Sequence, residues 1–142
     1  MPNWCKGRLR ISGKPELIKR FVAYACSKSE GNDNILDADR FIPRPRIEGE
    51  VFSSNQWCAK HWGTKWGMCE AELVAENYEL GVVEYAFETA WSPCGPVVEA
   101  MSKRFPELLF VYSYVEPWGG FEGYLVCMKG KVIQHKHEEF KA

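Results

Sequence analysis

The sequence predicts an α+β protein of the ferredoxin-like class, in which two helices cover one face of an antiparallel sheet. Its periodic segments follow the order strand, helix, two strands, helix, strand, which is that of two split strand-helix-strand units. The chain has 142 residues, enough to bury about two thirds of its unfolded surface in one core. We therefore expect a single ferredoxin-like domain over residues 1–142, with a helical insertion and an extra C-terminal hairpin.

The first strand is expected over residues 4–12, where apolar and basic side chains alternate with the two-residue period of a half-buried strand. Gly13 ends this strand, and Pro15 suits the first turn of a helix. Apolar residues then recur at helical spacing and predict a helix over residues 15–27: Leu17, Ile18, Phe21, Val22 and Ala25.

Residues 29–50 are rich in Gly, Asn, Asp and Pro and predict a long irregular connection. Its 41–45 portion must be extended, because residues before proline disfavour the helical region. A long connection in a compact domain is more often functional or specifically packed than idle. A short helix follows, capped by Ser53 and stopped by Gly63, with one face formed by Trp57, Cys58, His61 and Trp62.

Residues 66–77 and 82–91 each alternate and predict a hairpin with its turn at residues 79–81. A helix with an apolar stripe from Val97 to Phe105 ends at Pro106, and a strand over residues 108–115 follows. A last hairpin (123–128 with 132–133) precedes a tail expected to fray. The ferredoxin-like order places the first strand beside residues 82–91, so we expect cross-strand ion pairs between two sets of charges: Lys6, Arg8 and Arg10 with Glu84 and Glu88.

The net charge of -1 conceals an uneven distribution along the chain. Residues 1–50 carry +3, residues 51–100 carry -5 and residues 101–142 carry +1. These sums provide no basic stripe of the kind that grips phosphate backbones. No apolar run approaches the ~20 residues of a membrane span, and the amino terminus lacks a secretory pattern. We expect a cytoplasmic protein without a membrane partner.

Six cysteines are scattered along the chain with no Cys-x-x-Cys motif, and a cytoplasmic compartment predicts six thiols, without disulfides. His135 and His137 form the one local pair of metal-ligand type, which is too few for a zinc site. We expect no metal and no cofactor. A nucleophilic Cys58 or Cys69 beside His61 stays open as an alternative, although buried thiols are favoured.

Four motifs carry a resemblance to a known family: Met1-Pro2-Asn3-Trp4-Cys5, His61-Trp62-Gly63-Thr64-Lys65-Trp66, Phe87-Glu88-Thr89-Ala90-Trp91-Ser92-Pro93 and Gly119-Gly120-Phe121-Glu122-Gly123. Together they resemble the YubB-type proteins of enterobacterial plasmids and prophages. The resemblance covers essentially the whole chain and implies the ferredoxin-like fold, but no activity, substrate or cofactor. The chain departs from the family pattern at Gly7, where Asn is usual, and at Cys94, where a second Pro is usual.

The candidate binding surface is where the second and third motifs should meet, since antiparallel pairing brings the start of one strand beside the end of the other. The residues expected there are Trp62, Thr64, Lys65, Trp66, Trp91 and Ser92. An aromatic corner of the core is the competing interpretation. We favour a binding module for a protein or small ligand over an enzyme with a cleft beside these tryptophans.

A single-stranded nucleic-acid binder is the second alternative. Phe110, Tyr112 and Tyr114 share a strand face, as bases stacking on a sheet would require. The basic and glycine-aromatic signature of such sheets is absent, however, so packing in the core or a dimer contact is favoured.

Overall fold

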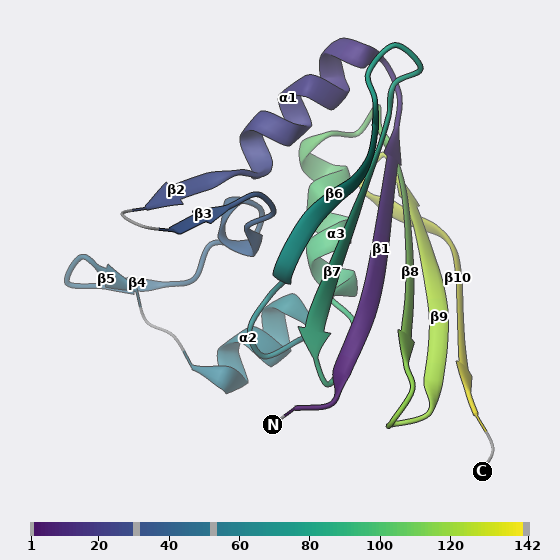
Figure 1. Ribbon diagram of the computed structural model, residues 1–142. Coiled ribbons are helices and arrows are strands. Elements are labelled where there is room, and N and C mark those ends of the chain that lie inside the picture. Colours follow the sequence, from purple (N-terminus) through teal and green to yellow (C-terminus); the bar gives the residue numbers. More distant parts are fainter. Residues whose placement is uncertain (1, 30–31, 52–53, 141–142) are drawn as a thin grey trace.

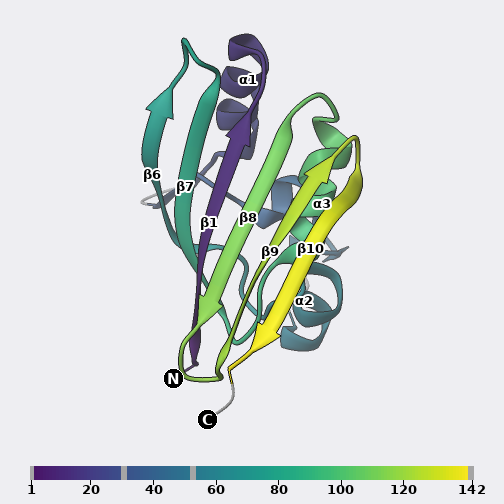
Figure 2. The ribbon, with the colours of Figure 1, turned by 90° about the vertical axis from the view of Figure 1, so that its right-hand side faces the viewer.

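The computed structural model shows a six-stranded antiparallel sheet with all helices on one of its faces (Figures 1 and 2). It describes residues 2–29, 32–51 and 54–140. The elements in chain order are β1 (Trp4–Ser12), α1 (Pro15–Ala25), β2 (Ser27–Ser29), β3 (Asn32–Asn34), the 3₁₀ helix η1 (Ala38–Arg40), β4 (Arg46–Ile47), β5 (Glu50–Val51), α2 (Asn55–Trp62), β6 (Cys69–Asn77), β7 (Val82–Ala90), α3 (Gly95–Arg104), β8 (Leu109–Glu116), β9 (Phe121–Met128) and β10 (Lys131–Glu139).

The strand order is β10-β9-β8-β1-β7-β6. Strands β8, β1, β7 and β6 form the sheet of the ferredoxin-like fold, and the predicted C-terminal hairpin extends it beyond β8. Figure 2 looks onto the open face of the sheet, with the helices behind. The predicted α+β class and strand order are therefore confirmed. Within the described residues, no helix is long and apolar enough to cross a membrane.

Strand β1 has the predicted bounds and alternation, with Cys5, Leu9 and Ile11 fully buried on the helix side. Its basic side chains point to the open face, where the register sets Lys6 opposite Glu88 and Arg10 opposite Glu84. One ion pair closes diagonally, with Arg8 Nη1 3.1 Å from Glu84 Oε2. The predicted neighbourhood of β1 and β7 is thus correct, and an exposed pair of this kind contributes about 0–1 kcal/mol.

The core lies between the sheet and the helices α1 and α3. Phe21 of α1 is at its centre, with ring centroids 5.3 Å from Phe105, 5.6 Å from Phe110 and 6.2 Å from Tyr85. The apolar stripe predicted for α3 is buried, including Val97, Val98 and Met101. Phe110 and Tyr112 are fully buried as well, so these two rings of β8 pack in the core and offer no platform for bases.

Gly7, where the YubB-type resemblance led us to expect Asn, lies between two aromatic rings. The Phe87 and Tyr112 rings stack across it with centroids 5.6 Å apart. A Cβ atom at Gly7 would lie 2.9 Å from Tyr112 Cε1 and 3.0 Å from Phe87 Cε2. The second departure touches the same ring, because the Cys94 N–H donates to the Tyr112 hydroxyl at 3.3 Å. Both unusual residues therefore accommodate Tyr112.

Several predicted boundaries were wrong by a few residues. Helix α1 ends at Ala25, because Cys26 is extended. The predicted cap Ser53 lies outside the described residues; Ser54 caps α2 instead, its side chain accepting from Trp57 N–H at 3.0 Å. Strand β6 begins at Cys69 and not at residue 66, because the intervening residues form the turn that carries part of the candidate site. Gly63 ends α2 in the left-handed region as predicted, with φ 80°.

The 29–50 connection was expected to be irregular, but it contains two small hairpins, β2-β3 and β4-β5, and the 3₁₀ helix η1. Asp39 holds it together by accepting from Arg44 at three nitrogens, the shortest contact being Nη2 to Oδ2 at 2.6 Å. Burial opposes ionisation of Asp39, but the bonds from Arg44 outweigh it and lower the pKa of the carboxyl. The connection is therefore specifically packed.

The tail after residue 133 was expected to fray, and this expectation was wrong. Strand β10 continues to Glu139 and pairs with β9 along its length, apart from one register shift between Val132 and Gln134. Its side chains are mostly exposed on both faces, so backbone hydrogen bonds hold it and leave no apolar pattern to read. In this strand the His137 Nδ1 lies 2.8 Å from the Tyr114 hydroxyl.

Candidate functional site

Four segments meet at the end of the sheet that lies nearest the N-terminus (Figures 1 and 2). They are the start of β1, residues 63–68, the turn after β7 and the β8-β9 turn. Each carries a tryptophan with exposed surface: Trp4, Trp66, Trp91 and Trp118. We call this region the tryptophan end. Five of the six predicted site residues, all except Trp62, belong to it.

Trp62 was expected on the surface, but it is 3% exposed and belongs to the core. Its indole N–H donates to the Ile42 carbonyl at 2.8 Å, and the Arg44 guanidinium lies 5.4 Å from its ring centroid. Trp57 packs edge-on against it at 5.9 Å. Trp62 thus fastens the 29–50 connection to α2, and the 41–45 segment covers this ring and not the exposed tryptophans.

Trp66 is 49% exposed and leans on Trp4, with ring centroids 6.0 Å apart and an interplanar angle of 56°. Trp4 lies on the open face of β1, directly opposite Ala90 of β7. Tilted aromatic pairs at this distance contribute about 0.5–1.5 kcal/mol beyond their buried area. The Trp4 ring therefore packs against the Trp66 ring and supports it, although Trp4 was not among the predicted site residues.

Trp91 is 44% exposed and adopts φ 70°, the left-handed region. A bulky residue in this region carries about 1–2 kcal/mol of backbone strain. The turn is held by neighbouring backbone: Trp91 N–H donates to the Asn3 carbonyl and Ser92 N–H to the Ala90 carbonyl, each at 2.9 Å. Lys65 Nζ lies 5.7 Å from the Trp91 ring centroid, within reach of a cation-π interaction.

Thr64 and Ser92 are two of the predicted site residues, and both use their hydroxyls in hydrogen bonds to the scaffold. Thr64 is fully buried and its Oγ1 donates to the Ala90 carbonyl at 2.8 Å. Ser92 Oγ donates to the Gly63 carbonyl at 2.5 Å, and its own carbonyl accepts from Thr89 Oγ1 at 2.7 Å. These bonds tie residues 63–64 to the Trp91 turn, so the polar residues fix the backbone that presents the rings.

Trp118 is 84% exposed in the β8-β9 turn, and the buried Glu116 carboxylate anchors this turn. Glu116 Oε1 accepts from Trp118 N–H at 2.9 Å, and Oε2 accepts from Gly119 N–H. A carboxylate holding two backbone N–H groups rigidifies the turn. In the sequence, Glu116 directly precedes Pro-Trp-Gly-Gly, but only the structure shows that its carboxylate anchors this turn.

Burial raises the pKa of five of the six thiols, including both cysteines considered as nucleophiles. Burial raises the pKa of Cys5 and Cys127 to about 11 and of Cys94 to about 12. Burial also raises the pKa of Cys58 and Cys69, the two proposed partners of His61. An activated thiol requires the opposite shift. The His61 ring instead stacks on Trp57 at 4.4 Å.

Two hollows of about 730 Å³ lie elsewhere on the molecule. One is on the open face of the sheet, with predominantly acidic charged side chains among its lining residues: Lys6, Arg8, Glu70, Glu72, Glu88, Glu122, Lys136 and Glu138. The other is on the helix side, between α1 and the end of α3. Trp66 and Trp91 line neither of them. Among the described residues, no group of three or more His, Cys, Asp or Glu side chains is arranged to hold a metal ion.

The fold and this site define a small ferredoxin-like α+β protein that presents anchored tryptophans at one end of its sheet. A family model described as the ferredoxin-like domain in Api92-like protein matches residues 61–142, more than half of the chain. The chain therefore belongs to this Api92-like family. It is also similar in fold to the crystal structure of the protein api92 from Yersinia pseudotuberculosis, with a TM-score of 0.60 and 13% identity over 100% of this chain and 99% of that one. A comparison with curated proteins finds no match.

Proposed function

We propose that this protein is a binding module whose partner is another protein, and that Trp66, Trp91 and Lys65 form the centre of the contact. The observation that carries the proposal is Trp91, a half-exposed ring held in a strained left-handed backbone. Strain persists only where the surroundings enforce it, and it concentrates at functional positions. A core aromatic would not need this turn, because its ring would be turned inward.

The surroundings of these rings support a protein contact. Aromatic residues form the centre of such interfaces, and polar or charged side chains form the rim. Trp4 and Trp118 extend the apolar area along the tryptophan end, and Lys65 adds a charge beside it. The backbone beneath is pre-ordered by buried hydrogen bonds, which lowers the conformational entropy lost on binding.

The two alternatives are less well supported. An enzyme with its cleft beside the tryptophans would need convergent polar groups there, but the Thr64 and Ser92 hydroxyls are bonded to backbone carbonyls. A single-stranded nucleic-acid binder would need stacking rings with cations, and Phe110 and Tyr112 are buried. Among the described cations, Lys65 alone is placed over an exposed tryptophan.

The test is an affinity pull-down from the host followed by measurement of Kd for the purified partner. Trp66→Ala and Trp91→Ala should each weaken binding by about 30-fold or more, the effect of losing a hot-spot aromatic. Leu80→Ala is the matched control, because Leu80 is an exposed apolar residue (75%) in the β6-β7 turn at the opposite end of the sheet. Equal loss in all three variants, or recovery of nucleic acid in place of protein, would refute the proposal.

We further propose that the chain acts as one domain in the cytoplasm of cells that carry a plasmid or prophage. The four motifs of the YubB-type resemblance support the mobile-element origin, and the six free thiols are compatible with a reducing compartment. Fractionation of cells that express the tagged protein tests the location, and limited proteolysis tests whether one protected unit is obtained.

A further inference from the structure

The hollow on the helix side is lined by arginines from two elements, α1 and α3. Arg20 and Arg104 line it, together with an apolar floor formed by Leu17, Tyr24, Phe105 and Leu108. Arg40 packs on the ring of Tyr24. Helix α3 begins near the tryptophan end and runs away from it (Figure 1), so Arg104 at its last turn is distant from the proposed protein contact. We call this site the arginine hollow.

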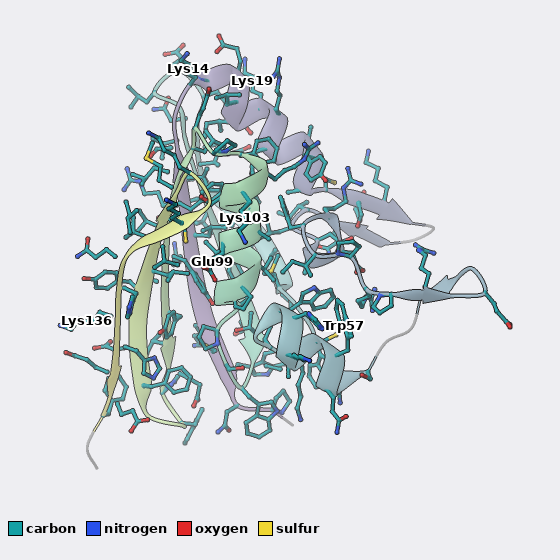
Figure 3. All side chains as sticks on the ribbon, turned by 180° about the vertical axis from the view of Figure 1, so that it is seen from behind. Lys14, Lys19, Trp57, Glu99, Lys103 and Lys136 are labelled. Carbon is teal, nitrogen blue, oxygen red and sulfur yellow. The ribbon has the colours of Figure 1, made fainter. Side chains whose placement is uncertain are left out.

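Among the described residues, no carboxylate forms an ion pair with the guanidinium groups of Arg20, Arg40 or Arg104. In the described part of the chain the ion pairs are Arg8 with Glu84, Arg44 with Asp39 and Lys136 with Glu138, and none uses Arg20, Arg40 or Arg104. Glu107 is the one carboxylate among the residues that line the hollow. The site therefore has an excess of positive charge. Lys14, Lys19, Lys103 and Glu99 lie outside the lining of the hollow, on the same side of the molecule (Figure 3).

Tyr24 pre-orders two of these arginines. The Arg40 Cζ lies 4.3 Å and the Arg104 Cζ 4.7 Å from its ring centroid. Arg40 is fixed further by its Nε–H, which donates to the Tyr24 carbonyl at 2.8 Å. Phe41 and Phe105 hold the tyrosine ring edge-on, at 5.5 Å and 5.7 Å. Guanidinium groups that rest on an aromatic face keep their N–H edges available for planar anions.

We propose that the arginine hollow binds a small organic anion, with an apolar body on the Leu17-Phe105 floor and a carboxylate or phosphate head on the guanidinium groups. A volume of about 730 Å³ is in the range of small-molecule sites. An inorganic ion would leave the apolar floor uncovered, and a neutral apolar molecule would leave the arginines unused. Charged heads pair bidentately with guanidinium, which provides both orientation and affinity.

Calorimetric titration of the full-length protein with octyl phosphate and octanoate tests the proposal. Octanol keeps the apolar body without the charge, and inorganic phosphate keeps a charge without the body. We expect at least one of the two amphipathic anions to bind about tenfold or more tightly than both controls, since a charge-assisted hydrogen bond and a buried chain each provide at least that factor. Arg20→Gln and Arg104→Gln should each weaken its binding about tenfold or more. Lys19→Gln removes the same charge from the neighbouring position on α1 and should leave the affinity unchanged.

Each contrary outcome overturns a defined part of the reasoning. Equal binding of octanol would reduce the hollow to an apolar patch, and equal binding of phosphate would reduce it to general anion attraction. Equal loss in Lys19→Gln and Arg104→Gln would exclude a localised site. Tighter binding of a single-stranded oligonucleotide would indicate a polyanion surface instead. Arg104→Lys retains the charge without the planar fork and should still weaken the amphipathic anion, while circular dichroism verifies that all variants fold.

Discussion

The substitution Thr64→Val replaces one hydroxyl by a methyl group at the tryptophan end. The hydroxyl of Thr64 donates to the Ala90 carbonyl at 2.8 Å, but this carbonyl also accepts from Ser92 N–H at 2.9 Å. Removal of the hydroxyl therefore costs one hydrogen bond, about 1 kcal/mol, and does not leave an orphaned acceptor, which would cost up to about 3 kcal/mol. The methyl group must retreat from 2.8 Å to a carbon-oxygen contact of about 3.3 Å or more. We expect a total loss of about 1–2 kcal/mol.

Urea unfolding followed by circular dichroism measures this loss as a lower midpoint with an unchanged slope. Thr64→Ser is the matched control: it keeps the donor and loses a buried methyl, so it has a similar stability cost but retains the tie to the Trp91 turn. Partner binding should therefore fall in Thr64→Val and persist in Thr64→Ser. A Thr64→Val protein with wild-type stability, or equal binding by both variants, would refute the role assigned to this hydroxyl.

Three further predictions concern the core. Tyr85→Phe should raise the free energy of unfolding by about 1 kcal/mol, because its buried hydroxyl has no hydrogen-bond partner among the described residues; a loss in urea unfolding would indicate a bridging water. Gly7→Ala should cost about 1–3 kcal/mol by overpacking Tyr112, and Phe87→Leu should restore part of it; a neutral Gly7→Ala would show that the rings yield freely. Burial raises the pKa of Cys5 from 9.0 to about 11, so the thiol is protonated in the folded state while the unfolded thiol ionises. Stability should fall as the pH rises from 9.0 to about 11, and Cys5→Ala should show a smaller fall over that window.

Alternation in the sequence was sufficient to predict most of the sheet. In β1 and β7 one face packs under the helices and the other carries charge, so the two-residue period is clear and the pairing of Arg8 with Glu84 could be anticipated. Strand β10 lacks this contrast, because neither of its faces is well covered. Its position depends on backbone bonds to β9, which no side-chain pattern reports.

The candidate site remains a prediction, but the structure shows how its residues are arranged. The second and third motifs were expected to meet, and hydrogen bonds do join residues 63–64 to the Trp91 turn, whereas Trp62 is turned into the core and bonds to Ile42. The difference arises at single backbone torsions, such as φ 70° at Trp91, and tertiary hydrogen bonds determine these. The hydrophobicity and spacing of a tryptophan in the sequence therefore do not tell whether its ring points into the core or toward solvent.

Charge is the property that the linear sequence concealed most. Segment sums showed no basic region, yet Arg20 and Arg104 line one hollow on the helix side, and Arg40 packs on the ring of Tyr24, which also lines that hollow. The hollow on the open face of the sheet instead contains more carboxylates than basic groups. The two hollows therefore differ in the sign of their charged linings. Helix α3 runs away from the tryptophan end and carries Arg104 in its last turn, so a protein partner can contact the exposed rings without covering the arginine hollow.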